Sequence, residues 1–243
     1  MTLPIAILAG GLATRMRPLT QRIPKVLLEV AGKPFAVHQL ELLRENGFRD
    51  VVFCIGHLGE MVERELGDGS QLGMSIRYSH DGDRLVGTGG ALIRALPLLD
   101  DPFLVIYGDS YLDCDYAGAE HAFVDSGKLG LMTVLRNEGR WDSSNIVYRD
   151  GAIIRYDKKN RTDDMHHIDY GLGGLHHRAL DGYPRDASVD LADVYADLVA
   201  RHELSAFEVT QRFYEIGSPD GLREFEEYLS GRQGASRRAE DAP

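Results

Sequence analysis

Residues 4–18 read PIAILAGGLATRMRP, an apolar run that passes directly into a glycine-rich turn. Ile5 to Leu8 carry no polar side chain, which is typical of a strand covered by helices on both faces. Short apolar runs then alternate with helical patterns: FAVHQLELLREN at 35–46, VVFCIG at 51–56, LGEMVERELG at 58–67, SIRYS at 75–79, GGALIRALPLL at 89–99 and FLVIYGD at 103–109. This alternation predicts an α/β fold with a doubly wound, mainly parallel sheet.

In the second half the sequence pattern changes to short apolar segments separated by turns. Strands and hairpins are expected there at 129–135, 145–150, 152–158 and 168–177. A helix is expected from Leu191, with Asp190 at its amino end, followed by strands at 206–209 and 213–217. Ser218 then caps a closing helix that has Pro219 at its first position. Residues 231–243 lack an apolar period, so we expect a disordered tail there. We predict a single domain over 1–230 with two halves, at about 1–115 and about 116–230.

Composition excludes several classes of protein. The 243 residues include 27 Lys and Arg against 38 Asp and Glu, a formal net charge of -11, so a wide nucleic-acid-binding surface is not expected. The apolar run at the start is far shorter than the roughly 20 residues of a membrane span. The two cysteines, Cys54 and Cys114, sit inside apolar runs and are expected to be reduced thiols. These features predict a soluble cytoplasmic protein without a membrane or nucleic-acid partner.

The glycine-rich turn is a candidate phosphate site. Gly10 and Gly11 let backbone N–H groups approach phosphate oxygens, and Arg15 and Arg17 carry donors for charge-assisted hydrogen bonds. Lys25 follows Pro24 and is placed to return to the same strand-end cleft. The segment has neither the GxxxxGK[ST] pattern of a P-loop nor GxGxxG. A glycine turn that follows a first strand and binds nothing is the open alternative.

Two further segments fall where an open α/β sheet collects ligands. Gly87-Thr88-Gly89-Gly90 opens a helix, whose positive end and close backbone approach suit an anion. Asp109 ends the buried run at 103–107 and is a candidate ligand of Mg²⁺, which prefers oxygen donors. Helix capping or solvation is the alternative for Asp109.

At this point the chain resembles the sugar-phosphate nucleotidyltransferases, whose pattern LAGGxGTRLxPLT precedes PKP. Here the segments read LAGGLATRMRPLT and, next, QRIPKVL. The resemblance implies that Gly10 and Gly11 wrap a triphosphate, that Arg15 stabilises phosphate charge and that Lys25 reaches the reacting phosphate. The pattern departs at Ala13, where glycine is usual, and at Val26, where proline is usual.

The resemblance extends in order to about Leu229 and implies a set of site residues on a Rossmann-like nucleotide-diphospho-sugar transferase fold. It implies a nucleotide-binding half at about 1–115 and a sugar-phosphate-binding half at about 116–230. FYEIGSP at 213–219 resembles WxDIGTP, which makes Glu215 a second Mg²⁺ ligand beside Asp109, although Glu215 is longer than the usual aspartate. A surface carboxylate beside a turn is the alternative for Glu215. The implied catalytic residues are Arg15, Lys25 and Asp109, and the implied nucleotide-binding residues are Leu8, Ala9, Gly10, Gly11, Thr14, Arg15, Gly87, Thr88 and Gly89.

The segments that correspond to the family's sugar-phosphate-binding motifs, here called the acceptor side, match the family pattern more loosely. Tyr156-Asp157-Lys158 resembles FxEKP, and the IDYGL segment at 168–172 stands where many members have NAGIY. The implied sugar-phosphate-binding residues are Lys25, Gly108, Asn145, Lys158, Asp169 and Gly171. For Asp169, a polar residue on a half-buried strand is the open alternative.

The implied activity is Mg²⁺-dependent transfer of a nucleotidyl group from a nucleoside triphosphate to a sugar 1-phosphate, with release of pyrophosphate. The chain looks most like heptose 1-phosphate guanylyltransferases, which favours GTP. Uridylyl, thymidylyl and cytidylyl transfer to a hexose or amino-sugar 1-phosphate stays open, as does a homodimer. Two rival classes remain: a glycosyltransferase that uses Asp113 and Asp115, which we instead interpret as helix-capping and solvated, and a non-catalytic nucleotide-binding regulator.

Overall fold

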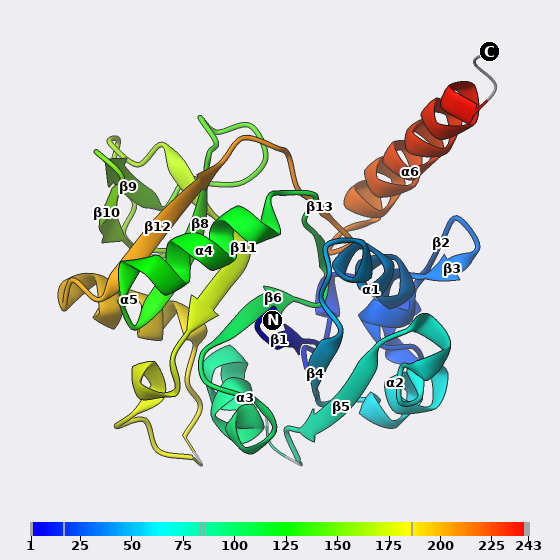
Figure 1. The fold of residues 1–243 in the computed structure, drawn as a ribbon, viewed down its shortest axis with the longest axis horizontal. Coiled ribbons are helices and arrows are strands. Elements are labelled where there is room, and N and C mark those ends of the chain that lie inside the picture. Colours follow the sequence, from blue (N-terminus) through cyan, green and yellow to red (C-terminus); the bar gives the residue numbers. More distant parts are fainter. Residues whose placement is uncertain (1, 17, 83, 85, 186, 241–243) are drawn as a thin grey trace.

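The computed structural model describes residues 2–240 except 17, 83, 85 and 186, and it describes only the backbone of residues 14 and 233–240. Nine strands form one mixed sheet (Figure 1): β1 (Ile5–Leu8), β4 (Asp50–Ile55), β5 (Ser75–His80), β6 (Phe103–Tyr107), β8 (Gly130–Arg136), β9 (Ile146–Arg149), β10 (Ala152–Tyr156), β11 (His167–Leu175) and β12 (Leu204–Val209). Two short ribbons pair β2 (Glu29–Val30) with β3 (Lys33–Pro34) and β7 (Ser110–Tyr111) with β13 (Tyr214–Glu215).

The sheet has a parallel half and an added antiparallel part. Its order is β10-β9-β11-β6-β1-β4-β5, with β8 beside β11 and β12 beside β8. Strands β6, β1, β4 and β5 run parallel, so their carboxyl ends meet at one edge, where Leu8 stands between Tyr107 and Cys54. Strand β11 pairs antiparallel with β6 and joins the second half of the chain to the first. The predicted mixed α/β sheet is confirmed.

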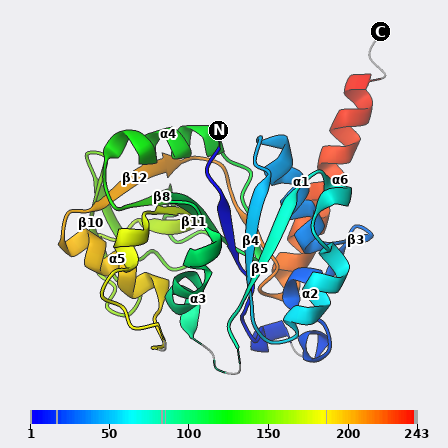
Figure 2. The ribbon, with the colours of Figure 1, turned by 60° about the horizontal axis from the view of Figure 1, so that its bottom comes forward.

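Helices cover both faces of this sheet (Figure 2). They are α1 (Phe35–Glu45), α2 (Gly59–Leu66), α3 (Gly87–Ala95), α4 (Tyr116–Ser126), α5 (Leu191–Ala200) and α6 (Pro219–Glu240). Side chains alternate between faces along each strand, so Ile5 and Ile7 of β1 belong to the core cluster that includes residues of α1, α2, α4 and α6. Ala6 belongs to the cluster that includes residues of α3 and α5. No helix in the described part of the chain is both long and apolar enough to cross a membrane.

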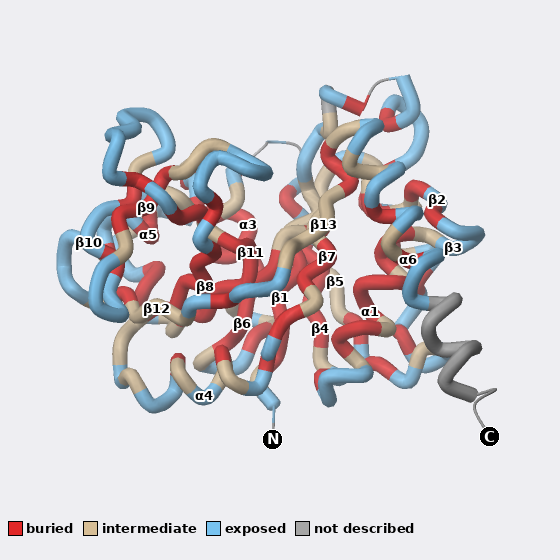
Figure 3. Tube along the Cα trace, turned by 90° about the horizontal axis from the view of Figure 1, so that it is seen from above, coloured by how far each residue is buried: buried red, intermediate tan, exposed pale blue. Residues whose placement is uncertain are grey.

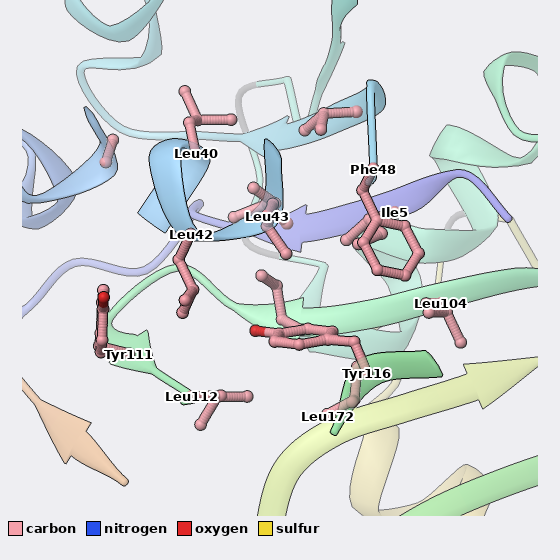
Figure 4. Packing of buried hydrophobic residues seen from close by; sticks show 14 of the residues in the cluster. Ile5, Leu40, Leu42, Leu43, Phe48, Leu104, Tyr111, Leu112, Tyr116 and Leu172 are labelled. Atoms are coloured by element: carbon pink, nitrogen blue, oxygen red, sulfur yellow. The ribbon is translucent and has the colours of Figure 1, made fainter. Parts of the chain in front are cut away.

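The central strands lie in the most buried part of the molecule, shown in red in Figure 3. On the face with α1 and α4, Phe48 and Tyr116 pack with their ring centroids 5.7 Å apart, and Leu43 and Ile5 lie close by (Figure 4). Both cysteines are buried and free, as expected. This packing fixes the strand ends on which the candidate site is built.

The predicted amino-terminal caps of α5 and α6 are present in the structure, but the carboxyl-terminal end of α6 differs from the prediction. The Ser218 hydroxyl accepts a hydrogen bond from the Gly221 N–H at 3.0 Å, which confirms the predicted cap of α6. Asp190 caps α5 by accepting from the Ala192 N–H at 2.9 Å. Helix α6, however, continues to Glu240 and projects from the body of the molecule in Figure 1, where a disordered tail was expected. The segment after Gly231 is rich in good helix formers, and it has no proline to stop the helix before residue 241.

Helix α3 begins at a glycine because another segment packs directly on its first turn. Gly87 has φ +74°, and a Cβ there would collide with the backbone oxygen of Val189. The Val189 N–H in turn donates to the Val86 carbonyl at 2.8 Å. A side chain at Gly87 would therefore meet both a strained backbone conformation and a backbone clash.

We expect Gly87→Ala to destabilise the protein more than Gly127→Ala, which also has a positive φ, +63°, but has nothing within 4 Å of its Cβ. The Gly127 variant should lose about 1–2 kcal/mol from the left-handed conformation. The Gly87 variant should lose about 1–3 kcal/mol more because the backbone must shift. Urea denaturation of both variants checks this. Equal losses would show that Val189 moves away freely.

Candidate active site

A cleft of about 500 Å³ opens at the carboxyl ends of the parallel strands. It is lined by residues from the first turn, from the start of α3 and from the end of β6: Leu8, Ala9, Gly10, Gly11, Leu12, Ala13, Lys25, Val26, Asp81, Gly87, Thr88, Ala91, Tyr107, Gly108 and Asp109. The structure thus brings together the glycine turn, the lysine and the strand-end aspartate, which are far apart in sequence. Most of the predicted nucleotide-binding residues face one cavity.

The glycine turn keeps a left-handed residue at the position where the sequence departs from its relatives' pattern. Ala13 has φ +46°, a conformation that glycine adopts without strain and alanine does not. Its carbonyl accepts the Thr20 hydroxyl at 2.8 Å and the Met16 N–H at 3.1 Å, which hold the turn in place. Arg15 is exposed. Arg17 and the side chain of Thr14 lie outside the described residues.

Lys25 and Asp109 form an ion pair on the wall of the cleft. The Lys25 Nζ lies 2.6 Å from the Asp109 Oδ2, and these side chains are 15% and 28% exposed. Gly108 precedes the aspartate, and a Cβ there would lie 2.9 Å from the Leu8 carbonyl oxygen, so β6 and the first turn can approach closely only with glycine at 108. Partial burial makes this pair more strongly coupled than an exposed ion pair.

Glu215 reaches the same site from the far end of the chain. Strand β13 pairs with β7 so that Glu215 stands opposite Ser110, and the Ile216 N–H donates to the Asp109 carbonyl at 3.0 Å. Burial raises the pKa of Glu215, and the Asp109 carboxylate raises it further, whereas Arg15 and Lys25 act in the opposite direction. Two carboxylates and two cations therefore converge beside the cleft.

The converging carboxylates suit a magnesium ion. Mg²⁺ commonly takes one or two protein carboxylates and fills its other positions with water and phosphate oxygens. Asp109 and Glu215 supply that donor set, and the described residues contain no group of three or more His, Cys, Asp and Glu side chains that would form a protein cage. The residues fit the ion, and its binding remains a prediction.

Gly89 does not line the cleft. Its N–H donates to the Val189 carbonyl at 2.9 Å, and a Cβ there would meet the Val189 side chain at 2.8 Å. The glycine is needed for packing of the 187–191 segment on α3, so the structure gives no support to its predicted contact with a nucleotide. Thr88 does line the cleft, and its hydroxyl donates to Asp190 and accepts from the Leu191 N–H at 2.8 Å.

The predicted acceptor residues gather in the second half of the sheet and carry polar atoms without partners. Asn145 Oδ1, Tyr156 Oη and Asp169 Oδ2 are buried, and the described residues give none of them a hydrogen bond. Gly171, at φ +109°, lies within a register shift between β11 and β8, and its N–H donates to Asp169 Oδ1 at 3.0 Å. Such a bulge redirects the side chains beside it. Tyr156 was not among the predicted site residues.

The charge of Asp169 acts on a residue that lines the cleft. Burial raises the pKa of Asp169, and Lys158 opposes that rise. Lys158 is exposed, and its Nζ lies 5.8 Å from the ring centroid of Tyr156. Burial raises the pKa of Tyr107, a cleft residue, and the negative charge of Asp169 raises it further. A Cβ built on Gly171 would lie 3.6 Å from the Tyr107 ring, so Asp169 and Gly171 lie near the cleft at its Tyr107 side.

Asp113 and Asp115 lie away from the cleft lining. Asp115 caps α4 by accepting from the Gly118 N–H at 2.8 Å, which confirms its interpretation as a helix cap. Asp113 accepts hydrogen bonds from Tyr228 and Arg232, both on α6. Neither carboxylate lines the cleft, and both are engaged in hydrogen bonds with α4 or α6.

Sequence reasoning missed Asp81, which directly follows β5 and lines the cleft. The residue is 5% exposed, and its Oδ1 is buried without a hydrogen-bond partner among the described residues. Burial raises the pKa of this carboxyl to about 6, although Arg94 and His80 oppose the rise. The only signal in the sequence was its place in the acidic run just before Gly87-Thr88-Gly89.

Comparison with known proteins shows which proteins the chain resembles in sequence. The chain is 31% identical over 218 residues to the mannose-1-phosphate guanylyltransferase catalytic subunit beta of Drosophila melanogaster, covering 88% of this chain and 59% of that protein. It is 46% identical over 114 residues to the N-acetylmuramate alpha-1-phosphate uridylyltransferase of Neisseria meningitidis, covering 46% and 49% of the respective chains. The chain thus spans about half to three-fifths of the length of these two relatives.

A solved structure shares the fold. The putative glucose-1-phosphate thymidylyltransferase of Bacillus anthracis superposes with a TM-score of 0.82 at 20% identity, covering 93% of this chain and 94% of that one. The family model described as "Nucleotidyl transferase" matches residues 5–144, which include the glycine turn, Lys25, Asp81 and Asp109. The chain therefore belongs to the nucleotidyl transferase family.

Proposed function

We propose that the protein transfers a guanylyl group from GTP to a hexose or heptose 1-phosphate in a Mg²⁺-dependent reaction that releases pyrophosphate. The observation that carries the reaction class is that the glycine turn and the Lys25–Asp109 pair line one strand-end cleft, and that Glu215 is held beside Asp109. Backbone N–H groups and cations suit a triphosphate, and paired carboxylates suit its magnesium ion.

The reaction needs no nucleophile from the protein. An oxygen of the sugar 1-phosphate attacks the α-phosphorus of the nucleotide, and the bond to the departing pyrophosphate breaks on the opposite side. Lys25 and Arg15 hold and neutralise the phosphate oxygens, so catalysis rests on positioning and on electrostatic stabilisation. Asp109 and Glu215 would hold Mg²⁺, which when bound supplies further positive charge to the phosphates.

The unpartnered atoms of the second half support an acceptor subsite. The unpartnered oxygens are those of Asn145, Tyr156 and Asp169. Together these groups can donate hydrogen bonds to sugar hydroxyls and accept hydrogen bonds from them. Lys158 can pair with the acceptor phosphate. Buried polar atoms without partners are costly to a folded protein, so their presence beside the cleft is explained if a polar ligand satisfies them.

The similarity to a mannose-1-phosphate guanylyltransferase over 88% of the chain favours GTP and a hexose 1-phosphate. A second candidate is uridylyl transfer, favoured by the 46% identity to an N-acetylmuramate alpha-1-phosphate uridylyltransferase over 114 residues. Heptose 1-phosphate is the alternative acceptor. We also propose a cytoplasmic location, and a homodimer remains compatible with this proposal.

The test is pyrophosphate release from GTP, UTP, dTTP and CTP with a panel of hexose, heptose and amino-sugar 1-phosphates in the presence of Mg²⁺. We expect one nucleotide and one class of acceptor to react. Asp109→Ala should abolish the reaction, whereas Asp113→Ala should retain it because that side chain is held by α6 outside the cleft. Release of nucleoside diphosphate from a nucleotide sugar, instead of pyrophosphate from a nucleoside triphosphate, and its loss in the Asp113 variant would favour the glycosyltransferase. Nucleotide binding without turnover across the panel would favour a regulator.

A further inference from the structure

Both predicted Mg²⁺ ligands are carried by the short ribbon of β7 and β13. Asp109 directly precedes β7, and Glu215 is the second residue of β13, where it stands opposite Ser110. Each strand of this ribbon has only two residues, and an isolated two-stranded pair is marginally stable at best in water. The position of the ribbon therefore depends on the elements that pack against it.

The Asp109 end of the ribbon is anchored by helix α1. The side-chain amide of Gln39 donates to the Tyr107 carbonyl at 3.0 Å and to the Ser110 carbonyl at 2.8 Å. Gln39 is buried, so these hydrogen bonds are shielded from competing water. They fix the backbone on both sides of Asp109.

Helix α6 supports the ribbon through aromatic side chains. Tyr214 of β13 and Tyr111 of β7 stand opposite each other, on one face of the ribbon. The Tyr228 ring stacks on Tyr214 with centroids 4.2 Å apart and planes at 23°, and the Phe225 ring lies 4.7 Å from that of Tyr111. Neighbouring residues of a strand point to opposite faces, so the Glu215 side chain lies on the face away from these rings.

Two further contacts fix α6 against the ribbon and the body of the protein. A Cβ at Gly221, in the first turn of α6, would collide with the Glu215 carbonyl oxygen, so only glycine allows the helix to approach this closely. Phe225 packs edge-on against Phe35 at the start of α1, with ring centroids 5.2 Å apart. Helix α6 is thus a fixed support on which the strand that carries Glu215 rests.

We propose that Tyr228 is a positioning residue for the magnesium site, because its stack on Tyr214 sets the place of Glu215 relative to Asp109. This inference rests on the proposed function for the presence of the metal. It goes beyond that function by assigning the geometry of the metal site to a helix outside the cleft. The residues that line the cleft include none from the described part of α6, so Tyr228 acts through the ribbon.

The experiment compares Tyr228→Leu, which removes the ring, with Tyr228→Phe, which keeps the ring and loses only the hydroxyl that donates to Asp113. Binding of Mn²⁺, a spectroscopic substitute for Mg²⁺, is measured on the protein without nucleotide by electron paramagnetic resonance. We expect Tyr228→Leu to weaken Mn²⁺ binding about 10- to 100-fold, the usual effect of removing a group that orients a metal ligand. Tyr228→Phe should bind Mn²⁺ like the wild type, because its ring still stacks on Tyr214.

A second background separates positioning from a general loss of structure. In Glu215→Gln, the change Tyr228→Leu should cause no further loss of Mn²⁺ binding, because both changes act on the same ligand. Tyr78→Leu is the matched control and should keep wild-type Mn²⁺ binding. Tyr78 also stacks on an aromatic ring, that of Phe53 at 6.1 Å, but it belongs to β5 and not to α6 or the ribbon.

Gly221→Ala tests the same support without removing a ring. Alanine favours a helix more than glycine does, yet the variant should weaken Mn²⁺ binding because the new Cβ displaces the Glu215 backbone. This variant decides the matter if Tyr228→Leu fails to fold, which urea denaturation of each protein shows.

Unchanged Mn²⁺ binding in folded Tyr228→Leu would overturn the inference. So would an equal further loss in the Glu215→Gln background, or a loss in Tyr228→Phe as large as in Tyr228→Leu, because neither result is compatible with positioning of Glu215 by the ring. A wild type that binds no Mn²⁺ would overturn it as well. The expected losses of Mn²⁺ binding in a protein that releases no pyrophosphate would reject the proposed function and leave this inference intact.

Discussion

Replacing Lys25 by alanine should lower turnover about 10²- to 10³-fold, by analogy with the removal of one preorganised donor from an active site. The Lys25 Nζ is 2.6 Å from Asp109 and lies on the cleft wall, where positive charge stabilises phosphate oxygens as the α-phosphorus changes partners. The loss should fall mainly on kcat, because the glycine turn and Arg15 still bind the triphosphate. Steady-state pyrophosphate release with saturating substrates measures it.

Lys33→Ala is the matched control for this variant. Lys33 also pairs with a carboxylate, Glu41 at 2.8 Å, but its side chain is 49% exposed and does not line the cleft. Turnover of the Lys33 variant should stay within about twofold of the wild type, since a surface ion pair contributes little. Unchanged turnover in Lys25→Ala would remove that lysine from the mechanism and leave the Asp109 ion pair as a purely structural contact.

The sequence predicted the parallel half of the fold because three of its four strands contain short apolar runs, separated by clear helical patterns. Phe103 to Ile106 and Val51 to Ile55 are buried and covered on both faces, so these positions are constrained toward apolar residues. The carboxyl-terminal part of α6 could not be predicted in the same way. Residues 231–240 have no apolar period, and helical continuation there depends on intrinsic propensity rather than on packing.

Those parts of the candidate site that form a short, continuous pattern in the sequence could be predicted. The glycine turn and the strand-end Asp109 are each visible as a short pattern that follows an apolar run. Glu215 is different, because only the pairing of β13 with β7 brings it to Asp109 from more than 100 residues away. The resemblance to a known family indicated that Glu215 lies near Asp109, whereas periodicity and composition did not.

Asp81 and Gly89 show two further limits. An aspartate in a polar segment reads as solvated, and only the structure shows that Asp81 is 5% exposed and without a donor. Gly89 sits in a glycine run that matches a ligand-binding pattern, yet its nearest neighbour is Val189 of another segment. A glycine required for close packing cannot be distinguished in sequence from one required for a ligand.

The burial of Asp81 should make the ligand-free protein less stable than a variant without the charge. Its pKa is raised from 3.8 to about 6, so the folded state holds the proton more tightly than the unfolded chain does. Wild-type stability therefore declines, relative to a residue that does not titrate, as the pH rises from about 4 to about 6. The full cost of the charge is present above pH 6, where it amounts to about 3 kcal/mol.

We therefore expect Asp81→Asn to raise the free energy of unfolding at pH 8 by up to about 3 kcal/mol and to leave it unchanged near pH 4. Arg94, His80 and Cys54 are the titratable groups that face Asp81 or interact with its charge, and all are common to both proteins, so the difference isolates Asp81. Urea denaturation at both pH values, without nucleotide, measures it. Asp68→Asn should have the opposite sign, because hydrogen bonds from Ser70 lower the pKa of Asp68. A destabilised Asp81 variant at pH 8 would mean that the carboxylate has a structural partner. A stabilised one would show that the free protein holds this charge at a cost that a bound ligand can offset.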